Sequence, residues 1–200
     1  MGKRSERGVR TRFESDVGDL IRVFAIDPGE TSGWAVVRAR VGDGGVGVRV
    51  ESWGADEVRM GVAGIEEWGG GVDGFWREKA SRSSGVTAQA MILLGLIERF
   101  DPDVLVLEDF ILDVGRASGK RGLLSPVQVI AMLEMGIVWR GLEMVVVRQS
   151  PSDAKTAIPD RRLKSAGMWS VGSAHARDAT RHALLYLRRS SNRGLGTARR

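Results

Sequence analysis

The sequence predicts an α/β domain built on a mixed sheet, with antiparallel strands first and parallel strands after them. Three short β-rich runs near the start are joined by tight turns, which is typical of an antiparallel meander. Each of two later apolar runs follows a segment of helical periodicity, which is typical of strands linked by crossover helices. A chain of 200 residues suits one such domain.

The meander comes first, with strands expected at residues 21–27, 34–41 and 46–53. Pro28-Gly29 stops the first apolar run, and Gly44-Gly45 turns the second strand into the third. The third run alternates valines with polar or small residues, which is the pattern of a strand with one buried face.

The later elements alternate between helices and strands. Apolar spacing predicts helices over 86–99 and 125–139, a short helix over 150–158 and a last helix over 174–189. Strands are expected at 104–108 and 144–147. Ser150 and Ser173 precede helical segments and are predicted to be N-caps.

Three segments lie outside this pattern. Residues 1–19 are expected to form a loose charged arm, and 190–200 a disordered basic tail. Within the single domain, 20–189, residues 54–84 are rich in glycine and acids without a sustained period, so they are predicted to be an irregular insertion.

Composition narrows the class of protein. The absence of cysteine excludes disulfides, thiolate metal sites and thiol catalysis. No apolar stretch approaches the ~18 residues of a membrane span, and the first residues are polar, so no membrane association and a cytoplasmic location are expected.

Charge is distributed unevenly along the chain. Residues 41–112 carry 13 acidic against 6 basic side chains, whereas 159–200 carry 2 against 10. Clustered arginine and lysine gain affinity for nucleic acid by releasing counterions from phosphates. The basic segment therefore indicates either a nucleic-acid partner or a solvated basic tail.

Three carboxylates stand out by position. Asp27 ends the first strand, Glu108 ends the fourth, and Asp178 lies in the opening turns of the last helix, where His175 shares its face. A carboxylate at a buried strand end is costly unless it is paired, protonated or bound to metal. Taken singly, these side chains also fit a turn, a solvated strand end or a helix start. Together they predict a site for hard divalent cations, and His182 is expected to pack or to bond Asp178.

Basic side chains near these elements are candidate DNA contacts. Arg116, Lys120 and Arg121 follow the fourth strand in a glycine-rich loop, and a solvated loop is the alternative there. Arg177 and Arg181 lie on a flank of the last helix and are expected to contact DNA as well.

Four motifs in order resemble those of RuvC-type Holliday-junction resolvases, in the RNase H-like superfamily. Residues 26–35, with the pattern Asp-Pro-Gly-x-Thr-Ser-Gly, resemble the opening signature. Residues 104–110 resemble the strand that ends in Glu, 151–155 the segment with a DNA-contacting lysine, and 174–179 the terminal helix motif. The resemblance covers about residues 21–188 and implies an RNase H-like five-stranded mixed sheet flanked by helices.

The resemblance implies a catalytic site and a substrate. Asp27, Glu108, His175 and Asp178 would be catalytic and would bind two Mg²⁺ ions, with Mn²⁺ able to substitute. The activity implied is endonucleolytic: paired symmetric nicks, leaving 5′-phosphate ends, that resolve a four-way DNA junction.

The resemblance also implies contacts and partners. Lys155 and Lys164 would contact DNA, and Phe110 would stack on a base. A homodimer in a bacterial or phage-infected cell is implied, and residues 125–139 are apolar on more than one face, which suits a dimer. Asp109 adds a second acid beside Glu108 that could compete for metal.

Other functions fit parts of the pattern. A related RNase H-like nuclease could act on flaps, other branched DNA or RNA–DNA hybrids, because a fold does not determine a substrate. Asp-Pro-Gly-Glu-Thr also resembles the first phosphate loop of actin-like ATPases, and a DNA-binding module with a structural ion is a third possibility. The sequence identifies no helicase or branch-migration partner.

Overall fold

The computed structural model describes residues 19–41, 47–59, 85–110, 124–170 and 173–193. The strands are β1 (Asp19–Asp27), β2 (Thr31–Val41), β3 (Val48–Arg59), β4 (Val104–Glu108) and β5 (Val145–Gln149). The helices are α2 (Gly85–Phe100), α3 (Ser125–Trp139), α4 (Pro151–Ala157), α5 (Asp160–Ser165) and α6 (Ala174–Arg193).

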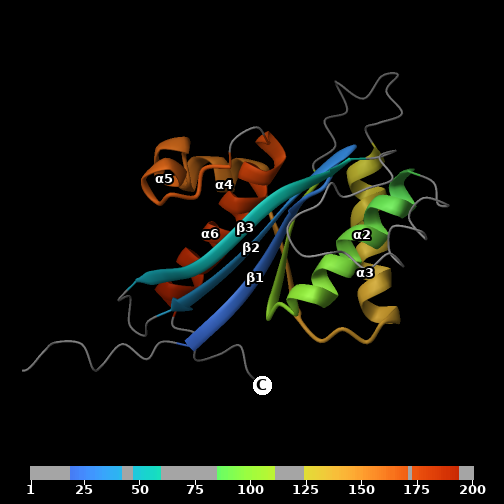
Figure 1. The fold of residues 1–200 in the computed structure, drawn as a ribbon, viewed down its shortest axis with the longest axis horizontal. Helices are drawn as coiled ribbons and strands as arrows, with labels where there is room; N and C mark the ends of the chain where they lie inside the picture. Colours follow the sequence, from blue (N-terminus) through green and yellow to red (C-terminus); the bar gives the residue numbers. More distant parts are fainter. Residues whose placement is uncertain (1–18, 42–46, 60–84, 111–123, 171–172, 194–200) are drawn as a thin grey trace, which may run out of the picture.

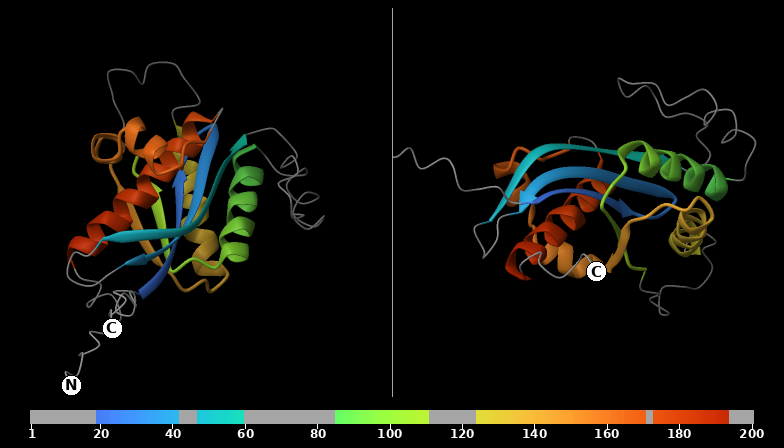
Figure 2. Two further views of the ribbon diagram at one scale, coloured as in Figure 1. Left: turned by 60° about the vertical axis from the view of Figure 1, so that its left-hand side comes forward. Right: turned by 90° about the horizontal axis from the view of Figure 1, so that it is seen from below.

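The strands form one mixed sheet in the order β3-β2-β1-β4-β5. The pairs β3-β2 and β2-β1 are antiparallel, whereas β1-β4 and β4-β5 are parallel. The predicted α/β class, with a meander followed by parallel strands, is confirmed. The central strands are almost wholly buried, because helices cover both faces of the sheet (Figures 1 and 2).

Alternation along the strands divides the core into two parts. Phe24 and Ile26 of β1 pack with α2 and α3 on one face, and Phe24 stacks on Trp34 with ring centroids 5.7 Å apart. Val23 and Ala25 face the other way and pack with α6. Because side chains alternate, the next residue of this second set is Asp27, on the α6 side.

The helices form the two outer layers. Helix α6 crosses β1, β2, β3 and β4, and the short helices α4 and α5 lie on the same side of the sheet (Figures 1 and 2). Helices α2 and α3 pack against each other on the opposite side. No helix among the described residues is long and apolar enough to cross a membrane.

Three elements differ from the sequence prediction. Helix α6 continues to Arg193, so residues 190–193 are helical where a disordered tail was expected, and Ser191 is buried there. Strand β3 continues to Arg59, into the predicted insertion, because β2 pairs with it along residues 54–59 although Gly54 interrupts the apolar alternation. Helix α5 was not expected from periodicity, since Leu163 is its single buried side chain. The insertion's remaining residues, 60–84, both terminal segments, 1–18 and 194–200, and the loop carrying Arg116, Lys120 and Arg121 lie outside the described residues.

The two predicted N-caps have different outcomes. Ser173 is confirmed, because its Oγ accepts a hydrogen bond from the Ala176 amide at 3.0 Å. Ser150 is the residue before α4, but its side chain makes no capping bond. Its Oγ instead lies 2.8 Å from the Oγ of Ser152.

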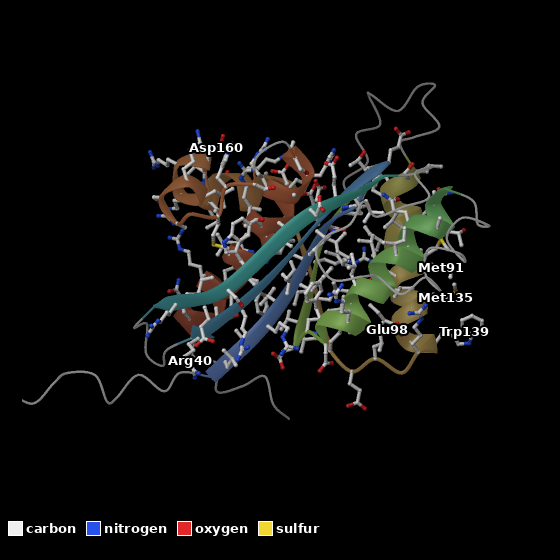
Figure 3. All side chains as sticks on the ribbon, in the orientation of Figure 1. Arg40, Met91, Glu98, Met135, Trp139 and Asp160 are labelled. Atoms are coloured by element: carbon white, nitrogen blue, oxygen red, sulfur yellow. The ribbon has the colours of Figure 1, made fainter. Side chains whose placement is uncertain are left out.

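Helix α3 has one buried and one exposed apolar face. Val129, Leu133 and Ile137 are buried against the core. Met135, Val138 and Trp139 are 60%, 81% and 88% exposed, and Met135 and Trp139 lie on the outer side of the molecule (Figure 3). The described structure therefore leaves an uncovered apolar surface on this helix.

Candidate functional site

A row of polar side chains crosses one end of the sheet on the α6 side. In the β1-β2 and β2-β3 pairings, Gly33 lies opposite both Asp27 and Glu57. In the parallel part, Glu108 lies opposite Gln149. The β1-β4 register, continued by one residue, sets Asp27 beside Glu108. The row therefore runs Glu57, Gly33, Asp27, Glu108, Gln149, one position from each strand.

Gly33 allows the last helix to approach this row. A Cβ atom at Gly33 would lie 2.0 Å from the carbonyl carbon of His175 and 2.5 Å from the Ala176 nitrogen. Those contacts are with backbone, which cannot rotate away as a side chain can. The missing side chain thus brings the first turn of α6, with His175 and Asp178, over the strand ends.

Asp27 and His175 form the first pair of the site. Nδ1 of His175 lies 2.9 Å from Oδ2 of Asp27, and Asp27 is only 7% exposed. Burial raises the pKa of Asp27, the negative charges of Glu108 and Asp178 add to the rise, and the His175 bond opposes it. The same hydrogen bond raises the pKa of His175 by more than burial lowers it.

His182 links the ends of β4 and β5. Its Nε2 lies 2.7 Å from Oε2 of Glu108, and its Nδ1 lies 3.0 Å from Oε1 of Gln149. A carboxylate only accepts hydrogen bonds, so Nε2–H is the donor to Glu108. The sequence predicted that His182 would pack or bond Asp178. The predicted partner is wrong, because the helix turns His182 toward β4 and β5, where it is buried and bonds Glu108 and Gln149.

Asp178 is held between two basic side chains. Its Oδ2 lies 3.1 Å from Nζ of Lys155, and its Oδ1 accepts from Arg181, which also bonds Asp160 and the Ile158 carbonyl. Burial lowers the pKa of Lys155, but the Asp178 bond and the charges of Asp178, Glu108 and Asp27 outweigh it and raise the pKa overall. Lys155 therefore lies within the field of all three carboxylates.

The donor set fits hard divalent cations. Carboxylate oxygens, with one imidazole, are ligands that Mg²⁺ and Mn²⁺ accept. Burial and the neighbouring negative charges raise the pKa of Asp27, and a bound cation would stabilise its charged form. Among the described residues, no three acidic or histidine side chains are yet gathered closely enough to hold an ion. The reason is visible in the contacts, since Asp27, Glu108 and Asp178 each face a different basic or imidazole partner.

The predicted DNA contacts are placed unequally. Lys155 is exposed at the site, whereas the Arg181 side chain is only 9% exposed and is committed to two carboxylates, so it positions Asp178 and is not available to phosphate. Lys164 and Arg177 both lie over the Trp169 ring, each 4.6 Å from its centroid. Phe110 is half-buried and packs against the core beside α2 and α3.

Two partners in the site, Glu57 and Gln149, were not predicted from the sequence. Glu57 accepts a hydrogen bond from Ser173 Oγ at 2.7 Å, and its charge contributes to the raised pKa of His175. Gln149 holds His182. Asp109, expected as a possible competitor for metal, has its Oδ1 3.5 Å from Arg148. The sequence feature that could have revealed Glu57 and Gln149 is a polar residue on the buried face of a strand end.

Comparisons with known proteins agree with this architecture. No protein-family profile and no curated protein matches the sequence. Among solved structures, Thermus thermophilus RuvC matches with a TM-score of 0.53 and 19% identity, over 86% of this chain and 98% of that one.

Two further structures match at the same level. The T. thermophilus RuvC complex with a Holliday-junction substrate matches with a TM-score of 0.52 and 17% identity, over 86% of this chain and 97% of that one. The yeast mitochondrial Holliday-junction resolvase Ydc2 matches with a TM-score of 0.53 and 16% identity, over 92% of this chain and 84% of that one. The chain thus has the RNase H-like fold of the RuvC-type resolvases, and the resemblance drawn from the motifs is confirmed at the level of the fold.

Proposed function

We propose that this protein, which has the RuvC-type resolvase fold, is a metal-dependent endonuclease that resolves four-way DNA junctions by paired symmetric nicks. The observation that carries the proposal is the polar row at the strand ends, where Asp27 and Glu108 face a helix bearing His175 and Asp178. One structural neighbour is named as a Holliday-junction resolvase and another as RuvC in complex with a Holliday-junction substrate, which supports the junction as substrate.

Asp27, Glu108, His175 and Asp178 would hold two Mg²⁺ ions, and Mn²⁺ could replace them. When bound, such ions activate the attacking water and stabilise the leaving oxygen in phosphodiester hydrolysis. To bind a cation, His175 would offer an unprotonated ring nitrogen, either Nε2 with Nδ1–H still donating to Asp27, or Nδ1 after that bond is released. Lys155 would then turn from Asp178 to the substrate phosphate. The phosphate would replace the Asp178 carboxylate as the anionic partner of Lys155.

Two nicks placed symmetrically need two sites related by a two-fold axis, so the proposed active form is a homodimer. The exposed apolar face of α3, with Met135, Val138 and Trp139, is the surface that we assign to the contact. Uncovered apolar patches of this kind mark interfaces more often than they mark monomer surface.

The alternative nuclease functions share the site and differ only in the substrate. A flap, another branched DNA or an RNA–DNA hybrid would meet the same carboxylates, and none of the described contacts selects among these substrates. The actin-like phosphate-binding function is disfavoured, because the polar row brings four strand-end side chains under one helix instead of leaving an open phosphate loop.

A substrate panel tests the proposal. The purified protein with Mg²⁺ is given a mobile four-way junction, a three-way flap, an RNA–DNA hybrid and a plain duplex of the same sequence. Paired symmetric nicks with 5′-phosphate ends in the junction, well above cleavage of the other three, are expected. Preferred cleavage of the hybrid or the flap would replace the proposed substrate with that one.

Carboxylate variants serve as matched controls in the same panel. Asp27→Asn, Glu108→Gln and Asp178→Asn keep the side-chain shape and remove one negative charge each. Each should abolish cleavage while junction binding survives or tightens, because phosphate repulsion falls. Near wild-type cleavage by any one of them would show that its residue is not a metal ligand.

A further inference from the structure

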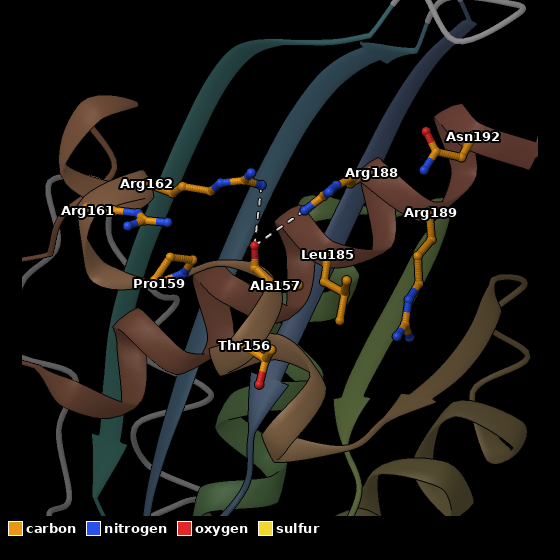
Figure 4. Close-up of a pocket in the computed structure, with 9 residues that line it drawn as sticks. All are labelled: Thr156, Ala157, Pro159, Arg161, Arg162, Leu185, Arg188, Arg189 and Asn192. Carbon is orange, nitrogen blue, oxygen red and sulfur yellow. Dashed lines mark hydrogen bonds between the residues drawn. The ribbon is translucent and has the colours of Figure 1, made fainter.

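An arginine-lined cavity lies beside the proposed active site, between α4, α5 and the C-terminal half of α6. Its lining includes four guanidinium groups and no carboxylate, and Figure 4 shows them around the end of α4. We call it the arginine cavity, after Arg161, Arg162, Arg188 and Arg189. It occupies about 480 Å³ and is open to solvent.

Two of the four guanidinium groups are held in place by a neutral acceptor, so no carboxylate balances their charge. Arg162 and Arg188 each donate one N–H to the Ala157 carbonyl, at 3.3 and 3.4 Å, so they converge on the end of α4 (Figure 4). A guanidinium has five N–H donors, and one bond therefore leaves most of them for a ligand.

The remaining pair differ from each other. Arg189 is balanced by Asp153, at 2.8 Å. Arg161 is exposed and has no ion pair or hydrogen bond with any residue in the described part of the chain. Three of the four positive charges in the cavity thus lack a carboxylate partner among the described residues, which favours an anionic ligand.

The cavity continues toward the proposed active site. A second cavity is lined by Lys155 and Asp178 of the site and also by Pro159 and Arg161, which line the arginine cavity as well. The second cavity is also lined by Asp160 and Arg181, which pair with each other. A largely basic surface therefore leads from Lys155 past Pro159 to Arg188. Successive phosphates on a nucleic-acid strand are the ligand that suits several guanidiniums arranged along a surface.

We propose that the arginine cavity binds backbone phosphates of the DNA arm that extends from the cleavage site past Lys155. The proposal rests on the proposed function for its choice of DNA, and it assigns the arm-binding residues that lie outside the catalytic row. The contact is with the backbone, so it adds affinity and orientation without selecting a base sequence.

Binding at increasing salt, with a chelator present, tests this assignment. The double variant Arg161→Gln with Arg188→Gln is compared with Arg38→Gln plus Arg49→Gln, which removes the same charge from the β2-β3 hairpin. Each phosphate contact contributes about 0.9 to the slope of log affinity against log salt. We expect the slope for a long-armed junction to fall by up to about 1.8 in the cavity variant and to stay near wild type in the hairpin variant. Equal slopes in the two variants would overturn the proposal.

The single variant Arg161→Gln is a control for misfolding, because Arg161 makes no described hydrogen bond or ion pair that would stabilise the fold. It should lower the slope by about 0.9 and leave the melting temperature unchanged. An unchanged slope in this variant would contradict the assignment, because Arg161 is the cation that lines both the arginine cavity and the cavity at the active site.

Arm length and nucleic-acid type separate the possible results. Shortening the duplex arms until they no longer reach the cavity should remove the difference between the cavity variant and wild type. A difference that persists with short arms, or that appears with duplex RNA and not with DNA, would contradict the assignment. Because no step requires cleavage, a positive result would stand even if the substrate panel failed to show junction resolution.

Discussion

At the scale of single residues, the site is organised by what each carboxylate contacts. Asp27 bonds Nδ1 of His175, the proposed ligand on α6, whereas Glu108 bonds His182, whose other nitrogen is held by Gln149. The bond from His182 uses Oε2 of Glu108 and leaves Oε1 for a cation. We therefore assign His175 as a ligand and His182 as a positioning residue.

The two histidines should respond differently to substitution. His175→Ala removes a ligand and should nearly abolish cleavage, and His175→Asp should restore it with a changed metal preference. His182→Ala should lower metal affinity about 10–100-fold, the usual cost of losing a group that orients a ligand. Calorimetric titration with Mn²⁺, alongside cleavage assays, measures both effects.

Gln149→Ala is the control for the His182 assignment. It removes the second support of the imidazole without touching Glu108, so its loss should be of the same kind as that of His182→Ala and smaller. Wild-type metal affinity in His182→Ala would show that His182 serves packing alone.

Substituting Asp27 should stabilise the metal-free protein. Burial raises the pKa of Asp27 in the folded protein. The protonated side chain therefore contributes to folding stability below the ordinary pKa of 3.8, and this contribution is lost as pH rises through the raised pKa of the folded state. His175, whose pKa is also raised, offsets this cost until it loses its own proton at higher pH.

Asp27→Asn should therefore melt above wild type, and the difference should grow with pH and be largest where His175 is neutral. A gain of about 2–4 °C corresponds to about 1 kcal/mol in a chain of this length. Thermal melts in chelator between pH 5 and about 9 measure it. A wild type that is more stable than the variant at the highest pH would show that burying the charged form of Asp27 does not cost stability.

At the scale of elements, the site depends on how closely α6 lies over the sheet. Gly33 leaves the space that the His175 backbone occupies, and Ser173 joins the start of α6 to Glu57 on β3 while capping the helix. The segment from Asp27 to Gly33 thus has two roles, since Asp27 is a proposed ligand and Gly33 lets α6 bring the other proposed ligands close to it.

Gly33→Ala tests whether the close approach of α6 to the sheet is needed for metal binding, apart from any general loss of stability. The added methyl would meet the His175 backbone, so α6 must shift, at a cost of about 1–3 kcal/mol and with loss of metal binding. Gly136→Ala is the matched control, because its methyl would meet the flexible Leu94 side chain between α2 and α3. The control should lower the melting temperature and keep metal affinity. Retained metal affinity in Gly33→Ala would show that close approach of α6 is not required.

At the scale of the whole molecule, the two sides of the sheet have different tasks. The α6 side carries the polar row and the arginine cavity, whereas the α2 and α3 side carries the exposed apolar face. A dimer formed through α3 would leave the proposed catalytic and arm-binding surfaces of each copy uncovered, on the α6 side.

Val138→Glu should dissociate the proposed dimer. Val138 is 81% exposed, so the change costs a monomer little, but it places a charge in the assigned contact. Sedimentation at micromolar concentration should show at least a ~10-fold weaker dimer, equivalent to ~1.4 kcal/mol. Leu20→Glu, at another exposed apolar position, should have no such effect. A wild type that is monomeric with and without junction DNA would exclude the dimer.

By itself, the sequence determined the sheet class, the order of the strands and of the helices other than α5, and the chain positions of the four proposed ligands. Apolar runs and periodicity are local properties, and Asp27, Glu108 and Asp178 each stand at a local boundary or on a helix face that these properties reveal. Strand alternation then leads from Val23 and Ala25 to a side chain facing α6.

Only the tertiary structure decided which groups meet across the sheet. The extension of β3, the contacts of Glu57 and Gln149 and the turning of His182 toward Glu108 all depend on strand pairing and on the close approach of α6. The burial of Arg181 and the convergence of Arg162 and Arg188 depend likewise on how α4 and α5 pack on α6. These contacts join residues far apart in the chain, and local periodicity does not determine the strand register that brings them together.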